Sequence, residues 1–274
     1  MDQISAVLRN FDIAAHVFYS GTLCRAEKFD SDAAVAYLHV LRAGNLLIRA
    51  PGMPDCRLQE PTAIFFPRPL KHRFLVSPSR GADLVCATVN YGLGVGNPLL
   101  DGLPPVLCIP LAGTNDLLPA TSLLFEEAFQ SRLGRQIALD RIFEYLFLLI
   151  LRHSMQNGLL QAGVLLALGD RKLAKAMACM HTAPGSAWTL EHLAQKAGMS
   201  RARFAAHFHR IVGTTPLDYL TKWRISMAMK MLNRGDSPKA VASAVGYSSS
   251  AVLSRLFVQR IGITPRRWKA QSNQ

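Results

Sequence analysis

The chain has 274 residues, half of them hydrophobic, which is enough for two domains of ordinary size that each bury a core. Its formal net charge is +13 at pH 7, and the excess lies in residues 171–274, which hold 17 Lys and Arg against 3 Asp and Glu, whereas residues 1–170 hold 14 against 15. This division indicates that the C-terminal half binds a polyanion. Nucleic acid is the first interpretation, and an acidic membrane surface or simple solvation are the alternatives.

The sequence argues against a membrane span and against a disulfide framework. Residues 1–12 (MDQISAVLRNFD) carry early acids and no long apolar stretch, so they do not resemble a signal peptide and a cytoplasmic protein is expected. The longest apolar run, YLFLLIL at residues 145–151, is far shorter than the roughly 20 residues that span a bilayer. The cysteines are odd in number and form no CxxC pair, which excludes a disulfide scaffold and a zinc finger: Cys24, Cys56, Cys86, Cys108 and Cys179.

Residues 13–110 alternate short β-rich runs with turn residues. Such runs, separated by Gly, Pro, Asn and Ser, predict an antiparallel sandwich or barrel. The predicted strands lie within residues 15–24, 35–44, 46–52, 56–59, 62–69, 72–78, 83–92 and 106–111.

Helical spacing begins after about residue 119. It predicts helices over residues 123–130 and 139–153, and the second is apolar nearly all round. Such a helix must be buried, either against a second subunit as a dimerisation element or against its own domain. Residues 156–169 carry little charge and are predicted to be a linker, and residues 170–274 are predicted to be wholly helical.

The basic half contains an internal repeat, residues 193–216 and 241–265. Each copy has a first helix, a Gly turn, a Ser that caps a second helix (Ser200, and Ser248 or Ser249), apolar residues four apart, and then Gly and Thr-Pro. This is the pattern of a helix-turn-helix, whose second helix enters a DNA groove. A helical hairpin within an all-α core is the alternative for one copy, but it does not require two Ser-capped, Arg-bearing helices.

A single helix is predicted between the two copies, over residues 216–232, because Pro stands at its first position and nothing interrupts it afterwards. Seventeen residues make a rod of about 25 Å. That length is close to the roughly 34 Å between successive major-groove segments. One chain is therefore expected to read two adjacent segments of a duplex.

These motifs resemble the DNA-binding domain of AraC/XylS transcription regulators. The resemblance covers about residues 170–269 and rests on the order and spacing of WTLEHLAQKAGMSRARFAAHF, GTTPLDYLTKWRISMAMKML, VASAVGYSSSAVLSRLF and GITPRRWK. The N-terminal part is similar to the cupin-type sensor domain of one branch of that family. This second resemblance rests on HVLRAG from His39, on PTAIFFPRPLKH, on Leu84-Val-Cys, and on the apolar helix near residues 140–152.

The resemblance implies an α+β protein with three parts. Residues 1–155 are expected to form a cupin-like antiparallel β-barrel with following helices that senses an effector and dimerises, residues 156–169 a linker, and residues 170–274 an all-α domain of two helix-turn-helix units joined by a linker helix. The implied function is a sequence-specific, non-enzymatic transcription regulator whose partners are double-stranded DNA, RNA polymerase, a small effector or oxidant, and a second copy of the chain. The rival interpretations are a cupin enzyme with a basic helical tail and a non-specific architectural DNA binder.

The resemblance also places the DNA contacts on the second helix of each unit. In the first unit the family's base-contacting positions fall on Ala202, Ala205 and Ala206, none of which donates a side-chain hydrogen bond. Arg201 and Arg203 flank them and are expected at phosphates or base edges. In the second unit the matching positions are Ser250, Ala251, Ser254 and Arg255. Arg255 is the candidate for a guanine contact, with a solvated surface side chain as the alternative.

The metal-binding cupin pattern is incomplete in this chain. His39 stands where the first motif begins, but residue 41 is Leu and no Glu follows at the required place, and His72 keeps only part of the second motif. Because a catalytic metal centre needs about three protein ligands, no such centre is expected. Separate strand histidines with local hydrogen bonds are the plain alternative.

Cys24, His39, His72 and Cys86 occupy strand positions similar to those in the branch of the family that senses reactive chlorine species. The resemblance implies that Cys24 is oxidised, or that the four residues bind copper or another soft metal ion. A reactive thiolate requires a lowered pKa, which a nearby histidine supplies if the fold brings the two together. Cys86 lies in an apolar strand, where a cysteine more often serves as a small hydrophobic residue.

Overall fold

The computed structural model describes residue 8 and residues 13–30, 35–90, 100, 102–160 and 162–272. Of the segment used above to argue against a signal peptide, only Leu8 is described. Contacts within the chain divide it into two compact units. The barrel unit contains Ile13–Gly94 and Leu103–Leu159, and the helical unit contains Leu160–Gln274.

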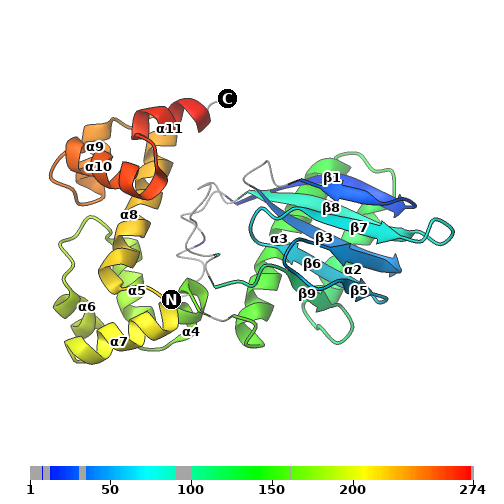
Figure 1. Ribbon diagram of the computed structural model, residues 1–274, viewed down its shortest axis with the longest axis horizontal. Helices are drawn as coiled ribbons and strands as arrows, with labels where there is room; N and C mark the ends of the chain where they lie inside the picture. Colours follow the sequence, from blue (N-terminus) through cyan, green and yellow to red (C-terminus); the bar gives the residue numbers. More distant parts are fainter. Residues whose placement is uncertain are drawn as a thin grey trace. The chain divides into compact units, whose positions relative to one another are not determined.

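The barrel unit consists of two antiparallel sheets (Figure 1). The first has the order β1 (Ala14–Leu23), β8 (Ala82–Asn90), β3 (Ala36–Gly44), β6 (Thr62–Phe66) and β9 (Leu107–Pro110). The second has the order β2 (Glu27–Phe29), β7 (His72–Val76), β4 (Leu46–Arg49) and β5 (Cys56–Leu58). Side chains of both sheets share one buried core, so the expected β-rich N-terminal domain of an α+β protein is confirmed.

Each strand predicted from the sequence overlaps a strand of the structure. The prediction missed β2, which is three residues long and reads Glu-Lys-Phe. Only Phe29 of this strand is buried, so no run of alternating apolar residues marks it in the sequence. Its pairing with β7 depends on contacts between residues more than 40 positions apart, which local patterns do not encode.

Two helices complete the barrel unit, α2 (Leu117–Ala128) and α3 (Arg135–Gln156). α3 packs against β1, β8 and α2, and the Phe147 ring meets Phe65 of β6 at 5.7 Å between centroids. The apolar residues of α3 are therefore largely buried within a single chain. This agrees with the second interpretation of residues 139–153, in which the helix packs against its own domain. Burial on the barrel accounts for the hydrophobicity of this helix without a second subunit.

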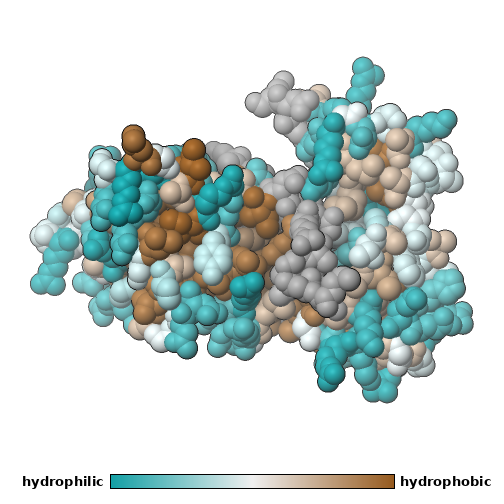
Figure 2. Space-filling view, turned by 180° about the vertical axis from the view of Figure 1, so that it is seen from behind, coloured by the Kyte–Doolittle hydropathy of each residue, from teal (hydrophilic) through white to brown (hydrophobic). Residues whose placement is uncertain are grey.

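Apolar side chains remain exposed on α2 and α3 and between them. Figure 2 shows hydrophobic residues gathered on one face of the barrel unit. The exposed apolar residues of this region are Leu118, Leu123, Phe129, Leu133, Ile137 and Tyr145. We call this surface the α2–α3 face.

The edge strand β1 contains a β-bulge at Phe18, between Val17 and Tyr19. α3 binds the backbone beside this bulge: the Val17 N–H donates to Asp140 Oδ1 at 2.8 Å, and Gln136 Nε2 donates to the Val17 carbonyl at 2.9 Å. An edge strand with unpaired backbone groups invites pairing with other chains. The two side chains of α3 satisfy those groups at this point.

The helical unit is built from eight described helices. They are α4 (Val164–Gly169), α5 (Leu173–Thr182), α6 (Leu190–Ala197), α7 (Arg201–Val212), α8 (Pro216–Asn233), α9 (Pro238–Ala244), α10 (Ser250–Ile261) and α11 (Pro265–Ser272). α8 is the longest, and within this unit α6 and α7 lie towards one end of it and α9 and α10 towards the other (Figure 1). α4 falls in the segment predicted to be a linker. Its residues Val164, Leu165, Ala167 and Leu168 are buried, and it packs against α5 and α7, so low charge in this segment reflects packing.

Two glycines allow the two halves of the helical unit to approach closely. Gly246, in the turn after α9, has φ of +85°, and a Cβ there would lie 2.6 Å from the Gly185 carbonyl oxygen. Arg224 of α8 holds the same loop, because it donates to the Pro184 carbonyl at 2.7 Å and to the Ser186 carbonyl at 2.8 Å. Its guanidinium also lies over the Tyr247 ring, 5.5 Å from the centroid. The second repeat is therefore fixed to the loop that precedes the first.

Candidate functional site: two capped helices and a buried histidine pair

The first helix-turn-helix is formed by α6 and α7. Gly198, with a left-handed φ of +63°, caps the end of α6, and Ser200 caps the start of α7, where its hydroxyl accepts from the Arg203 N–H at 3.4 Å. A left-handed Gly after one helix and a Ser cap before the next set a sharp turn between them. Phe204 and Phe208 of α7 are buried, so the opposite side of the helix faces solvent.

The second helix-turn-helix repeats this construction in α9 and α10. Ser249 caps α10 by accepting from the Val252 N–H at 3.3 Å, so the cap is Ser249 rather than Ser248. Leu253 and Phe257 are buried, as their counterparts in α7 are. The capping prediction and the placement of the apolar positions in the core are correct for both repeats.

The predicted DNA contacts lie on accessible parts of both helices. On α7, Arg201, Ala202, Arg203 and Ala206 are exposed and Ala205 is half-buried. On α10, Ala251 and Arg255 are exposed and Ser250 and Ser254 are half-buried. All nine positions therefore remain candidates for DNA contacts.

Several other polar residues of this unit have partners inside the protein. His207 Nε2 lies 2.7 Å from Asp170 Oδ2, and its Nδ1 accepts from Arg210 at 2.9 Å. Asp218 accepts from Thr214 at 2.7 Å and from Arg260, which ties α8 to the last turn of α10. These hydrogen bonds give His207 and Arg210 a structural role within the helical unit.

The barrel unit brings His39 and His72 into direct contact. Their Nε2 atoms lie 3.1 Å apart, and both side chains are buried. His72 Nδ1 lies 2.8 Å from the Leu70 carbonyl oxygen, which only accepts, so this nitrogen carries a proton. In the neutral pair His72 Nε2 is then the acceptor and His39 Nε2 the donor. His39 Nδ1 is consequently bare, and it has no hydrogen-bond partner among the described residues.

Aromatic rings enclose the histidine pair. His72 is stacked between Phe66 at 3.9 Å and Phe29 at 4.7 Å, and His39 meets Phe74 edge-on at 4.7 Å. Burial among these rings lowers the pKa of His72 to about 4. Burial, and then the neighbouring His72, lower the pKa of His39 well below its ordinary value. Both imidazoles are therefore neutral at physiological pH.

Cys86 belongs to this cluster, and Cys24 does not. Cys86 pairs in register with His39 on one side and with Tyr19 on the other, and burial raises the pKa of its thiol. Cys24 follows the last residue of β1, which pairs with Ala82, so Cys24 lies five residues along the strand from the Tyr19–Cys86 row. Cys24 is exposed, and the expected histidine neighbour is not beside it.

The histidine pair brings two imidazoles together, which is fewer ligands than a closed metal site requires. In the neutral pair the two Nε2 atoms are hydrogen-bonded to each other, and His39 Nδ1 keeps a lone pair that no described residue uses. Within the described part of the chain, no group of three or more His, Cys, Asp or Glu side chains could hold a metal ion.

A pocket of about 240 Å³ opens beside the histidine cluster. Apolar and aromatic side chains form most of its wall, with Arg25 and Glu27 as the charged exceptions. The lining residues are Phe18, Tyr19, Leu23, Arg25, Glu27, Phe29, Leu84 and Cys86. We call it the barrel pocket. Sequence patterns did not identify it because it requires β2, the strand that was missed.

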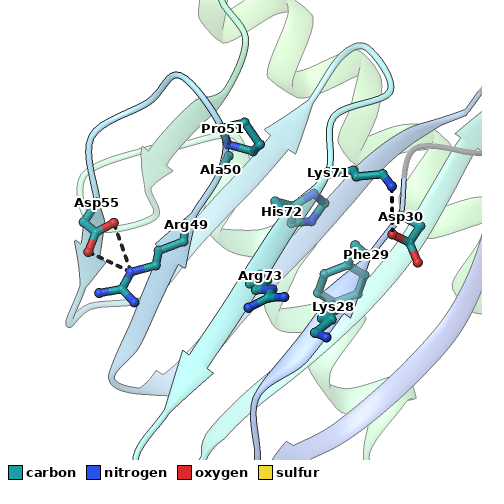
Figure 3. A pocket seen from close by; sticks show the side chains of 10 residues that line it. All are labelled: Lys28, Phe29, Asp30, Arg49, Ala50, Pro51, Asp55, Lys71, His72 and Arg73. Carbon is teal, nitrogen blue, oxygen red and sulfur yellow. Dashed lines mark hydrogen bonds and ion pairs between the residues drawn. The ribbon is translucent and has the colours of Figure 1, made fainter.

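A larger and more open hollow of about 660 Å³ lies over the second sheet (Figure 3). Lys28, Arg73 and Arg49 stand in one row across β2, β7 and β4, because Arg73 pairs in register with both of the others. Asp55 pairs with Arg49 at 2.9 Å, and Asp30 with Lys71 at 3.6 Å. Like charges directly opposed on neighbouring strands are destabilising, and the Asp55 carboxylate offsets part of the positive charge of this row through Arg49.

Both parts of the chain are similar to known proteins. A family model described as Cupin matches residues 2–156, and a helix-turn-helix domain model matches residues 193–271. An uncharacterized HTH-type transcriptional regulator of Haemophilus influenzae is 28% identical over 263 residues, 88% of either chain. The RCS-specific HTH-type transcriptional activator RclR of Escherichia coli is 29% identical over 89% of this chain and 87% of its own. A putative AraC-like transcription regulator of Streptomyces lividans is 34% identical over 66% of this chain, which spans 61% of that relative's length.

None of the described helices is long and apolar enough to cross a membrane. The matched segments agree with the units built above, since the cupin model ends at the last residue of α3 and the helix-turn-helix model begins within α6. The relatives that align over most of this chain are transcription regulators by name. The chain belongs to the cupin family through its N-terminal domain, and it is a DNA-binding transcription regulator of the AraC family.

Proposed function

We propose that this regulator binds its operator with both helix-turn-helix units of one chain, with α7 and α10 each in the major groove. The observation that carries the proposal is the repeated construction of the two helices: each starts at a Ser cap and presents exposed Arg on the side away from its buried Phe. α8, which joins them, has 18 residues and is therefore about 27 Å long. That length approaches the roughly 34 Å between successive major-groove segments.

The two units differ in the chemistry of the side chains they offer. Around Ala202, Ala205 and Ala206, α7 provides only methyl groups, which contact thymine methyls and form no hydrogen bond with a base. We assign Arg201 and Arg203 to phosphates. α10 provides Ser250, Ala251, Ser254 and Arg255, and we assign sequence discrimination mainly to this helix, with Arg255 at a guanine.

Selection of binding sites from random duplexes by the full-length protein tests this function. We expect one recovered sequence with two elements about one helical turn apart, bound at least about 10³-fold more tightly than random duplex at physiological salt. Affinity for both should fall steeply as salt rises, because Lys and Arg release counterions from phosphates. Equal affinity for selected and random duplex would instead support a non-specific architectural DNA binder.

We also propose that the barrel pocket receives a small effector. Its volume of about 240 Å³ is just below the roughly 300–1,000 Å³ of sites for drug-sized ligands, which favours a small, mainly apolar molecule. Arg25 and Glu27 are the charged residues that line it. Binding would act by shifting the population of DNA-binding conformations. A matched test compares Leu84→Phe, which fills the pocket, with Leu75→Phe outside it: only the first should abolish the effector response.

Oxidation of Cys24 is a second candidate for the input signal. Its exposure favours this, since a redox-sensing thiol must be accessible. The RclR relative is named as RCS-specific, which points to the same class of signal. Reporter transcription with Cys24→Ser should lose its response to hypochlorite or copper. A normal response in that variant would reject Cys24 and leave the barrel pocket as the sensor.

The remaining partners follow from this role. We propose that the chain forms a homodimer through the α2–α3 face. Burial of the exposed Leu133 and Ile137 side chains against a second copy would remove apolar surface from water. A second copy, RNA polymerase and operator DNA would meet in the cytoplasm. A cupin enzyme with a basic tail is the rival. Turnover of a small organic acid with stoichiometric bound metal would support that rival.

A further inference from the structure

The barrel unit has two seams where an edge strand of one sheet adjoins an edge strand of the other. β1 and β2 stand at one end of their sheets, and β9 and β5 at the other. The barrel pocket lies at the first seam, because residues of both β1 and β2 line it. Each edge strand of the second seam carries one cysteine, Cys56 on β5 and Cys108 on β9.

The two thiols face each other across the second seam. Cys56 pairs in register with Ile48, and Cys108 with Ile64, and both of these partners point into the core between the sheets. Both cysteines pack against that same core. The Cys56 and Cys108 side chains lie within hydrogen-bonding reach of each other, and both are free thiols and only partly buried.

We propose that Cys56 and Cys108 are a reversible redox pair that a two-electron oxidant such as hydrogen peroxide converts into a disulfide across the second seam. The two residues are 52 positions apart in the chain and belong to different sheets. The bond would therefore close the barrel on the side opposite the barrel pocket. This inference concerns the barrel unit alone and does not depend on the proposed DNA contacts.

The chemistry divides into two balanced steps. The Cys56 thiolate attacks a peroxide oxygen, an S–O bond forms as the O–O bond breaks, and hydroxide leaves, which gives a sulfenic acid. The Cys108 sulfur then attacks the Cys56 sulfur, the S–S bond forms as the S–O bond breaks, and the Cys108 proton leaves with the hydroxide as water. Two thiols and one hydrogen peroxide thus become one disulfide and two water molecules.

The surroundings of the two thiols determine which of them attacks the peroxide first. Burial, and then the neighbouring Cys56, raise the pKa of Cys108 to about 12, so this thiol stays protonated at neutral pH. A protonated thiol is a poor nucleophile towards peroxide. The first attack therefore belongs to Cys56, and Cys108 reacts once Cys56 is oxidised beside it.

Peptide mapping tests the pair directly. Full-length protein is oxidised with hydrogen peroxide, its free thiols are alkylated, and it is cleaved at Arg and before Asp, which separates Cys56, Cys86 and Cys108 onto residues 55–57, 83–100 and 101–115. We expect a peptide that joins Cys56 to Cys108 and disappears on reduction with dithiothreitol. Cys24→Ser should retain this peptide, whereas Cys56→Ser and Cys108→Ala should each lose it.

Thermal unfolding gives a second readout. A disulfide restricts the unfolded chain, so oxidation should raise the Tm of the barrel unit in the wild-type protein and in Cys24→Ser, and should leave the Tm of Cys108→Ala unchanged. Recovery of both Cys56 and Cys108 in alkylated form from oxidised wild-type protein would overturn the proposal. So would an unchanged yield of disulfide in Cys56→Ser.

Discussion

The histidine pair shows how a buried polar contact is held in one protonation state. His72 donates to a carbonyl through Nδ1, and this fixes the direction of the hydrogen bond from His39. A proton added to either ring would place a charge among Phe29, Phe66 and Phe74 with no buried acid to balance it in the described core. Neutrality of the pair is therefore a condition for the folded barrel.

Because both rings must stay neutral, we expect the free energy of unfolding of the barrel unit to fall as the pH is lowered. We call this fall the acid limb. The folded-state pKa of His72 is about 4, against about 6.5 in the unfolded chain, so the unfolded state binds more protons between these values. The contribution of neutral His72 to the free energy of unfolding is complete above pH 6.5. It is lost as the pH falls towards 4, and the loss is about 3 kcal/mol for His72 alone. His39 acts in the same direction.

Hydrogen exchange of the β3 and β7 amides measures this limb, since all three tryptophans lie in the helical unit and report only on that unit. His72→Phe removes one titrating ring and keeps a ring in the stack, so the fall in protection between pH 6.5 and 4 should shrink. His16→Gln, at an exposed position, is the control and should leave the limb intact. An unchanged limb in His72→Phe would contradict the assignment.

At the DNA-binding end, Arg255 is the residue whose loss should change specificity. It is exposed near the middle of α10, and α7 offers alanine at the corresponding face. Arg255→Ala should cost about 1–3 kcal/mol on the selected operator and relax the preference at one base pair. Arg201→Ala is the matched control and should weaken all sequences about equally. A uniform loss for Arg255→Ala would reassign this side chain to a phosphate.

At the scale of helices and strands, the sequence identified the parts whose signal is local. The Ser caps, the Thr-Pro starts and the buried Phe positions follow from patterns within a few residues, and the structure has them. β2 and the Cys56–Cys108 contact were missed because they depend on which strands adjoin. The sequence likewise did not show how far along β1 Cys24 lies from Tyr19, the register partner of Cys86, because strand membership does not give the register.

The turn glycines of the two repeats differ in their surroundings, although their sequence positions match. Both have positive φ, +63° at Gly198 and +85° at Gly246. A Cβ at Gly198 would meet nothing within 4 Å, whereas one at Gly246 would meet the Gly185 carbonyl oxygen at 2.6 Å. The second turn therefore carries both a conformational and a steric demand for glycine.

Gly246→Ala should accordingly destabilise the helical unit more than Gly198→Ala. The backbone conformation alone costs about 1 kcal/mol in each variant, and the clash adds to this at Gly246. Urea unfolding followed by tryptophan fluorescence measures both variants, because Trp188, Trp223 and Trp268 lie in this unit. Equal losses of stability in the two variants would show that the Gly185 loop moves aside without cost.

At the scale of the whole molecule, the distribution of charge assigns DNA binding to the helical unit, and contacts within that unit fix the positions of its helices. The barrel half is close to neutral and the helical half strongly basic, so attraction to DNA belongs to the helical unit. Within that unit, Arg224 joins α8 to the 184–186 loop, and the Asp218–Arg260 pair joins α8 to α10. These links on a continuous helix make the distance between α7 and α10 a fixed property of the chain.

A fixed distance predicts that the spacing of the two operator elements cannot change. Inserting about 5 base pairs turns the second element to the opposite side of the duplex, and inserting about 10 restores its side but moves it roughly 34 Å further away, beyond the reach of α8. Both insertions should reduce the affinity of the full-length protein towards that for random duplex, whereas the same insertions outside the two elements should not. Titration by fluorescence anisotropy measures each duplex. Full affinity at either altered spacing would show that the two units bind DNA independently, and Arg224→Ala would then leave operator binding unchanged.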